Sequence, residues 1–263
     1  MRVLSWNYQE LGSPRSVRAL KQISKSEKPD LFFLVETKAQ ETRIQVLQCQ
    51  LGYAHYVAVN ANGAPGGLAI LWRDNIQVKI RVADDRIIDA EVVSDQGNFW
   101  ITCVYGDPVR SNRHIVWNRI CSYGASHSDP WMCIRDFNSF LGWHEKVGGV
   151  QRGNHDISQF WDMLDKCGLM DLGSKGPAFT WNNRRSGSTN IRIKLDRAVA
   201  NAVCRLCFDN ASVQIRPTFS SDYNPVLVDT IGKVYYGIWP FRFEAMWAHD
   251  PSCKSIIAQS WGS

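Results

Sequence analysis

The tripeptide Asp136-Phe137-Asn138 places a carboxylate and an amide two residues apart after the apolar run Trp131–Ile134. Such a run is typical of a buried strand. Alternate strand residues share a face, so Asp136 and Asn138 are expected to project into one pocket. A carboxylate can activate water or hold a hard cation, and an amide can position an oxygen without adding charge. The pair indicates metal-assisted phosphodiester chemistry, with an ordinary turn at a strand end as the alternative.

Four other segments also carry a polar group where an apolar or alternating run ends. Met1–Asn7 ends in an amide, and Pro29–Glu36 ends in a carboxylate. Trp100–Gly106 ends in the phenol of Tyr105 and a glycine, and Ile191–Arg197 presents Asp196. A protein that gathers such ends at one rim of a sheet builds an active site there. We therefore expect these side chains to converge.

Length and composition narrow the class of protein. The chain has 263 residues, of which 44% are hydrophobic, which fits one large domain with a substantial core. No run of about 18 apolar residues indicates a membrane span, and no secretory signal is visible. Eight cysteines, mostly in apolar segments, favour reduced thiols in an intracellular protein. A net charge of +5 permits binding to a polyanion without requiring it.

Short strands separated by turns, with helices between them, are predicted along the chain. Helices are expected at Pro14–Lys25, Thr42–Leu51, Arg113–Tyr123 and Ser158–Lys166. Strands are also expected around Tyr56–Asn60, Gly67–Trp72, Val78–Val82, Ile87–Val93, Phe99–Tyr105, Pro177–Trp181, Ile191–Asp196, Val213–Arg216 and Val226–Val228. Mixed sheets with helices on their outer faces predict a layered α/β sandwich.

Nine short motifs follow one another along the chain: Ser5-Trp6-Asn7, Glu36-Thr37-Lys38, Gly67–Trp72, Val104-Tyr105-Gly106, Asp136-Phe137-Asn138, Glu145-Lys146 with Gly148-Gly149, Phe179–Asn182, Leu195-Asp196-Arg197 and Ser221-Asp222. In this order they resemble the endonuclease/exonuclease/phosphatase superfamily. More narrowly, they resemble the apurinic-endonuclease-like domain of plant LINE-type (non-LTR) retrotransposons. Any one motif is weak evidence, but nine in order are strong.

The resemblance assigns residues 1–229 to this domain and 230–263 to a linker. The aromatic-rich segment Tyr235–Trp247 changes the character of the chain, and Pro240–Glu244 within it resembles the joint to a reverse transcriptase. We therefore expect 230–263 to lead toward a reverse transcriptase domain, truncated here.

The resemblance implies a four-layered α/β sandwich that cuts DNA phosphodiesters with Mg²⁺, or with Mn²⁺ in its place. Carried over by position, Glu36 would be the principal metal ligand, assisted by Asn7 and Asp222. Asp136 would orient or deprotonate the attacking water, and Asn138 would contact the scissile phosphate. The expected partner is DNA, the expected location is the nucleus, and no membrane contact or particular oligomeric state is predicted.

The same resemblance makes Tyr105 a phosphate donor and makes Asp196 the group that orients a histidine after Asp222. The chain has Tyr223 at that position. A well-placed acid or base is worth roughly 10²–10⁴-fold in rate. Tyrosine keeps an O–H donor but cannot carry positive charge near pH 7. Metal binding through Glu36 is therefore expected to survive, and fast turnover is not.

Two further departures lie close by: Arg135 and Glu10 each occupy a position where the family has glycine. Together with Tyr223, they favour a decayed element copy over retuned specificity. The alternative is a catalytically inactive nucleic-acid-binding or residual domain. A phosphatase acting on small phosphoesters is a third, less favoured interpretation.

Three arginines carry smaller predictions. Arg184 and Arg185 are expected in a loop beside the site, where the resemblance implies contact with the DNA backbone and an ordinary basic turn is an equal alternative. Arg197 is expected to pair with an acid in a structural role.

Overall fold

A computed structural model describes residues 1–8, 14–61, 66–124, 129–151 and 153–232, with a few isolated residues near the C-terminus. Contacts between residues group Met1–Gly232 into one compact unit and Lys233–Ser263 into a second. Glu10 and Tyr235–Trp247 lie outside the described residues. The linker to a reverse transcriptase, including Pro240–Glu244, therefore stays a prediction.

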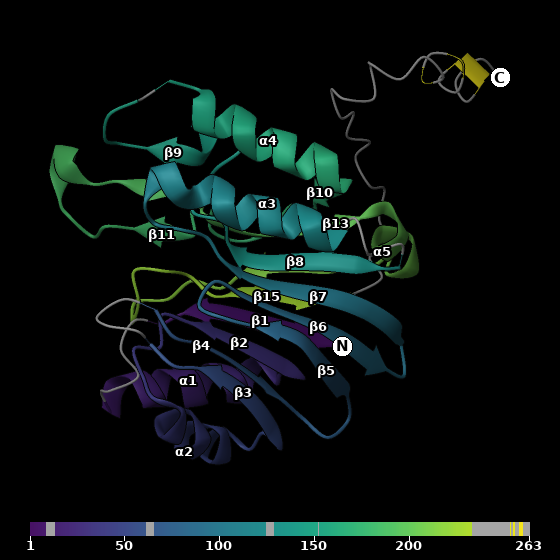
Figure 1. Cartoon of the computed structure of the whole chain (residues 1–263). Coiled ribbons are helices and arrows are strands. Elements are labelled where there is room, and N and C mark those ends of the chain that lie inside the picture. Colours follow the sequence, from purple (N-terminus) through teal and green to yellow (C-terminus); the bar gives the residue numbers. More distant parts are fainter. Residues whose placement is uncertain are drawn as a thin grey trace. The chain divides into compact units, whose positions relative to one another are not determined.

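The described part of the first unit contains two six-stranded sheets (Figure 1). The first sheet has, in spatial order, β14 (Ser212–Ile215), β15 (Val226–Asp229), β1 (Arg2–Asn7), β2 (Leu31–Val35), β4 (Leu68–Trp72) and β3 (His55–Val59). The second has β10 (Leu169–Asp171), β13 (Asp196–Asn201), β8 (Trp131–Asp136), β7 (Gly97–Tyr105), β6 (Ile87–Ser94) and β5 (Gln77–Ala83). A small third sheet joins β11 (Trp181–Asn182), β12 (Arg192–Ile193) and β9 (Lys146–Val147).

Each large sheet contains one parallel pair of strands among antiparallel neighbours. In the first sheet β1 runs parallel to β2, with Asn7 opposite Val35. In the second, β7 runs parallel to β8, with Tyr105 opposite Asp136. Parallel partners end at the same edge of a sheet, so each pair delivers two adjacent carboxyl-terminal ends to one rim.

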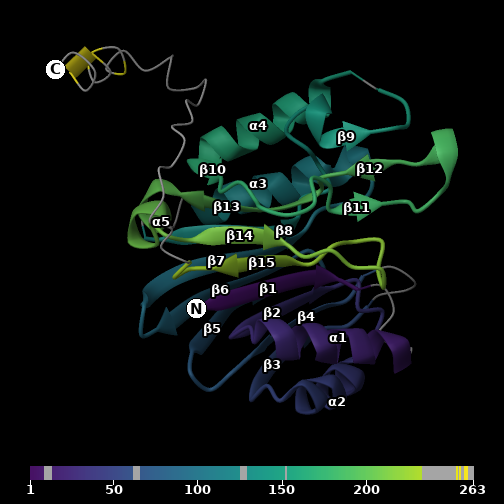
Figure 2. The ribbon, with the colours of Figure 1, turned by 180° about the vertical axis from the view of Figure 1, so that it is seen from behind.

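Helices cover the outer faces of the two sheets, as Figures 1 and 2 show. They are α1 (Pro14–Glu27) and α2 (Glu41–Leu51) on the first sheet and α3 (Arg113–Gly124) and α4 (His155–Cys167) on the second, with the short α5 (Ala202–Cys207) following β13. Three buried apolar clusters alternate with these layers: one lies between the two sheets, and one lies under each helix pair. The four-layered α/β sandwich predicted from the sequence is confirmed.

The second half of the chain differs in detail from the predicted elements. Only Trp181 of the predicted strand Pro177–Trp181 is in a strand, because β11 begins there. The predicted strand Ile191–Asp196 is divided, with Arg192–Ile193 in the small sheet and Asp196 opening β13. Among the described residues, none of the helices is long and apolar enough to cross a membrane.

Candidate active site

The ends of the two parallel strand pairs meet at one rim. Glu36 follows β2, beside Asn7 at the end of β1, and the Asn7 Nδ2 donates a hydrogen bond to Glu36 Oε1 at 2.9 Å. Tyr105 ends β7; burial, and then the charge of Glu36 and a hydrogen bond to it, raise the pKa of this phenol. The Tyr105–Glu36 contact joins the rim of one sheet to that of the other. The convergence expected from the strand ends is therefore present.

Glu36 and Asn7 offer oxygen atoms suited to a hard cation. Glu36 is half-buried and has a φ of +52°, a left-handed conformation that costs free energy for a residue with a Cβ. The fully buried Asn7 leaves its Oδ1 without a hydrogen-bond partner. A buried acceptor of this kind is costly unless something binds it.

The Asp136-Phe137-Asn138 segment holds its two polar side chains together by a turn and not by strand alternation. Strand β8 ends at Asp136, and Asn138 has a φ of +50°. The Asn138 backbone N–H donates to Asp136 Oδ1 at 2.7 Å, and its Nδ2 donates to the Gly106 carbonyl at 2.7 Å. A Cβ at Gly106 would lie 2.6 Å from the Phe137 backbone, so only glycine allows this close approach.

Asp136 and Asp196 lie directly opposite each other on β8 and β13, and both are fully buried. Burial and the neighbouring Asp196 raise the pKa of Asp136 well above its usual range. Burial also raises the pKa of Asp196, although the charge of Arg135 opposes this. The Thr180 Oγ1 accepts from the backbone N–H groups of Leu195 and Asp196 at 2.9 and 3.0 Å, which fixes the start of β13.

Arg135, which the sequence marks as a departure from glycine beside the site, is buried at the rim, and its pairing with Asp196 was not predicted. Its guanidinium is 0% exposed, and Nε lies 3.1 Å from Asp196 Oδ1. Nη1 donates to the carbonyls of Ser5 and Asn224 at 3.2 and 3.4 Å. The guanidinium also lies 5.6 Å from the centre of the Tyr223 ring. Its φ of +106° lies in the region that favours glycine, which agrees with the glycine expected at this position.

Tyr223 occupies the position that the sequence resemblance gives to a histidine, and it faces the acids of the rim. Burial, followed by the charges of Asp136, Asp196 and Glu36, raises the pKa of its phenol well above the usual range. Tyr223 therefore stays protonated and cannot act as a base near neutral pH. Its carbonyl accepts from Trp6 Nε1 at 2.9 Å, which ties this loop to β1.

Asp222 and Arg184 form an ion pair, with Asp222 Oδ1 3.0 Å from Arg184 Nε. Both side chains are about two-fifths exposed, at 43% and 41% respectively. Arg184 Nη1 also donates to the Phe219 carbonyl at 2.8 Å. This pairing competes with the metal role predicted for Asp222 and with the phosphate contact predicted for Arg184, and both roles stay predictions. Arg185 is exposed, and its predicted DNA contact is likewise untested.

Arg197 pairs with acids, as predicted from the sequence. Its guanidinium is 0% exposed, with Nη2 2.7 Å from Glu145 Oε2 and Nη1 2.6 Å from Asp171 Oδ2. The Lys194 ammonium lies 3.6 Å from Glu145, on the same cluster. These contacts fasten β13 to the segments that precede β9 and that form β10.

The donor set at the rim fits Mg²⁺ better than a metal held by protein ligands alone. Within the described ranges, no group of three His, Cys, Asp or Glu side chains is placed to hold a metal. Mg²⁺ usually binds through one or two carboxylates and completes its shell with water and substrate phosphates. The Glu36 carboxylate and the unpartnered Asn7 Oδ1 meet that requirement.

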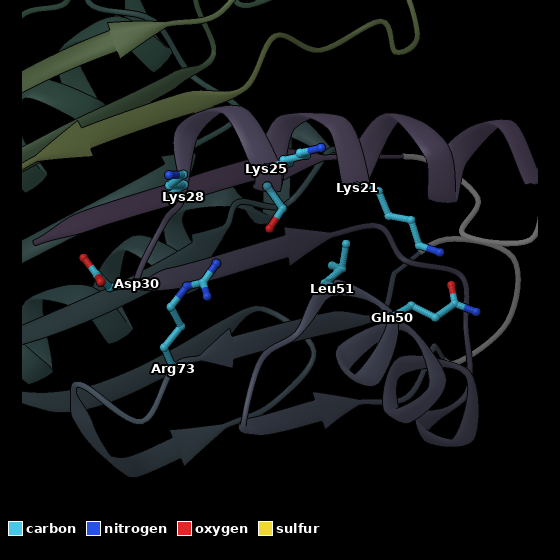
Figure 3. A pocket seen from close by; sticks show the side chains of 8 residues that line it. Lys21, Lys25, Lys28, Asp30, Gln50, Leu51 and Arg73 are labelled. Atoms are coloured by element: carbon cyan, nitrogen blue, oxygen red, sulfur yellow. The ribbon is translucent and has the colours of Figure 1, made fainter.

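A basic cavity of about 630 Å³ lies away from the rim (Figure 3). Lys21 and Lys25 reach it from α1, Lys28 reaches it from the position just after α1, and Arg73 reaches it from the segment after β4. Asp30, which precedes β2, also lines it, so the cavity lies toward the end of the first sheet opposite Glu36. It includes none of the predicted site residues.

Comparisons with known proteins agree with this architecture. Residues 4–222 match the family model described as the endonuclease/exonuclease/phosphatase family. No curated protein matches the chain.

Three solved structures illustrate the likeness. An AP endonuclease from Archaeoglobus fulgidus is 16% identical with a TM-score of 0.67, covering 87% of this chain and 98% of that one. The endonuclease domain of TRAS1, a telomere-specific non-LTR retrotransposon, is 14% identical with a TM-score of 0.66, covering 87% and 97%. The 3′ phosphatase NExo from Neisseria, bound to a product DNA hairpin, is 16% identical with a TM-score of 0.65, covering 87% and 98%.

At these identities the structural likeness shows a shared fold, while the family model spans most of the chain. The chain therefore belongs to the endonuclease/exonuclease/phosphatase family.

Proposed function

We propose that this chain is a Mg²⁺-dependent DNA endonuclease domain of retrotransposon origin whose cleavage step is impaired. The observation that carries the proposal is the meeting of Glu36, Asn7, Tyr105, Asp136 and Asp196 at one rim, from separate strands of two sheets. The likeness to the endonuclease domain of a non-LTR retrotransposon and to an enzyme bound to a DNA hairpin supports DNA as the substrate. Nuclear location and a following reverse transcriptase belong to the same proposal.

Glu36 and the Asn7 amide oxygen would hold the cation, which when bound neutralises charge on the phosphate oxygens. Asp136 has an Oδ2 without a hydrogen-bond partner, so this oxygen remains to orient the attacking water. The raised pKa of Asp136 makes its carboxylate a stronger proton acceptor than an exposed one. Asn138 uses one amide N–H on Gly106 and keeps the other for a phosphate oxygen. Tyr105 remains a protonated donor.

The proposed impairment of cleavage comes from Tyr223 and Asp196, which lie in the same site as the metal ligands. A histidine can carry a proton between a carboxylate and a phosphate oxygen near pH 7, and Tyr223 cannot. Asp196 is also paired with Arg135 at 3.1 Å. These two observations equally favour the alternative, a domain that binds nucleic acid without cleaving it.

Nicking of supercoiled plasmid across a Mg²⁺ titration tests the proposal, with Glu36→Gln as the site variant and the exposed Glu41→Gln as its matched control. We expect slow nicking that rises with Mg²⁺, is lost in Glu36→Gln and is kept in Glu41→Gln. Calorimetric titration of Mg²⁺ should show binding that only Glu36→Gln removes.

The outcomes separate the two candidates. DNA and Mg²⁺ binding together with nicking no faster than that of Glu36→Gln would establish the non-cleaving alternative. Equal Mg²⁺ binding by the chain and by Glu36→Gln would remove Glu36 as the main ligand and overturn the proposal.

A further inference from the structure

Arg135 places a positive charge inside the site without exposing it to substrate. Its side chain is 0% exposed, so the guanidinium cannot touch a phosphate of bound DNA. Its charge therefore acts on the groups around it, which include Asp196 at 3.1 Å, the Tyr223 ring at 5.6 Å and the neighbouring Asp136. All three belong to the acid–base side of the rim.

The contacts of Arg135 are less complete than those of Arg197, which leaves only its Nε without a hydrogen-bond partner. The Nε of Arg135 is close enough to Asp196 for an ion pair, but it is not aligned for a hydrogen bond, and Nη2 has no hydrogen-bond partner at all. The backbone has a φ of +106°, which is strained for any residue with a side chain. Both the unpartnered guanidinium nitrogens and the strained backbone cost free energy, so another interaction must stabilise Arg135. Asp196 is the acid close enough to provide it.

From this geometry we propose that Arg135 is the internal counter-cation of Asp196 and that it prevents Asp196 from serving a proton carrier at position 223. Arg135 and Tyr223 therefore act together: the Arg135 guanidinium neutralises Asp196, and the uncharged Tyr223 ring packs over the guanidinium. The inference rests on the proposed function for its effect on cleavage, but the ion pair can be tested on its own.

A specific consequence follows for repair of the site. Tyr223→His alone would place an imidazole beside a carboxylate that Arg135 already holds. Arg135→Gly alone would free Asp196 and relieve the backbone, but it would leave Tyr223 in place. Only Arg135→Gly with Tyr223→His provides both a free carboxylate and a proton carrier.

The first experiment measures Mg²⁺-dependent plasmid nicking by the native chain, the two single variants and the double variant. We expect the double variant to nick roughly 10²-fold faster than the native chain, and each single variant to stay within about threefold of it. Arg135→Lys with Tyr223→His, which keeps the cation, should stay as slow as Tyr223→His. Tyr56→His serves as the control for an imidazole placed elsewhere.

Full recovery by Tyr223→His alone would show that Arg135 does not withhold Asp196 and would overturn the proposal. A double variant that binds Mg²⁺ yet nicks no faster than the native chain would overturn it equally.

The second experiment measures thermal unfolding of Arg135→Gly, Asp196→Asn and their combination, without metal. Arg135→Gly should lower the midpoint by about 5 °C because it leaves Asp196 buried and unpaired, and adding Asp196→Asn should recover most of that loss. Strictly additive losses would remove the ion pair and with it the proposal. If no protein in the series nicks or binds Mg²⁺, the proposed function fails, while non-additive unfolding still supports Arg135 as the counter-cation.

Discussion

Two buried arginines lie opposite each other on β8 and β13, and they differ in almost every other respect. Arg197 meets Glu145 and Asp171 at 2.7 and 2.6 Å, so its guanidinium is surrounded by carboxylates. Arg135 has one carboxylate at 3.1 Å, two long bonds to carbonyls and a φ of +106°. The same residue type therefore serves a carboxylate-rich structural cluster at one position and a strained, less completely paired one at the position opposite.

The difference shows where this fold tolerates local conflict. Glu36, Arg135 and Asn138 have positive φ values, and all three lie at the rim. Asn7, Asp136 and Asp196 leave buried oxygens without hydrogen-bond partners. Strain and unsatisfied polar atoms concentrate at functional sites because binding or chemistry, and not stability, requires them. The Arg197 cluster has fewer residues with positive φ values and fewer buried polar atoms without hydrogen-bond partners.

The largest expected effect separates the two arginines directly. Arg197→Gly leaves Glu145 and Asp171 buried without their cation and should cost about 3–5 kcal/mol in free energy of unfolding. Arg135→Gly should cost about 1–3 kcal/mol less, because glycine adopts the observed backbone without strain. Urea denaturation of the matched pair measures both. An equal or larger loss in Arg135→Gly would contradict the contrast.

A second test uses pH, because the pKa values of Asp136 and Asp171, one acid from each region, are shifted in opposite directions. Burial and Asp196 raise the pKa of Asp136, so its contribution to stability is present below the unfolded pKa of about 3.9 and is lost as pH rises. For Asp171, burial raises the pKa, but Arg197 and Lys194 outweigh it and the net pKa is lowered. Its contribution is present above the unfolded value and is lost as pH falls.

Asp136→Asn should therefore stabilise the chain at pH 7, and Asp171→Asn should destabilise it. The Asp136 difference should shrink toward pH 4, whereas the Asp171 difference should persist at pH 4 and shrink only below it. Chemical denaturation in EDTA at several pH values checks the two signs. Two changes of the same sign at pH 7 would show that the regions do not differ electrostatically as described.

The smallest expected effect concerns the loop arginines. Arg184 is tied to Asp222, and an ion pair this exposed contributes about 0–1 kcal/mol. If Arg185 contacts a phosphate, Arg185→Ala should lower the salt dependence of DNA affinity by about one unit in the logarithmic slope, and Arg184→Ala should lower it less. Fluorescence anisotropy over a salt series measures this. A larger change for Arg184→Ala would reverse the assignment.

Much of the fold was predictable because the apolar runs are long and regular. The strands that end at Asn7, Val35, Tyr105 and Asp136 are fully buried over most of their length, so their composition alone indicates them. The short strands after residue 170 were less predictable, since β11 and β12 are set by pairing with β9 and with each other rather than by local sequence.

The convergence of the strand-end side chains at one rim was predictable from the sequence, whereas their individual contacts were not. Asp196 was expected at the end of a strand but opens β13; because β13 is antiparallel to β8, its beginning lies beside the end of β8 and the prediction of a shared rim still holds. The pairing of Arg135 with Asp196 depends on a side-chain direction that no spacing rule supplies. The departure from glycine at that position, noted in the sequence, marked Arg135 as unusual but did not identify its partner.

The placement of β1 between β15 and β2 affects how the chain folds during synthesis. Arg2 pairs with Asp229, so the N-terminal strand waits for residues more than two hundred positions later before its second neighbour exists. Contacts of such long range form slowly and leave an open strand edge in the meantime. During synthesis β1 therefore keeps one unpaired edge until β15 has been made, and we expect a chain truncated before β15 to be prone to aggregate.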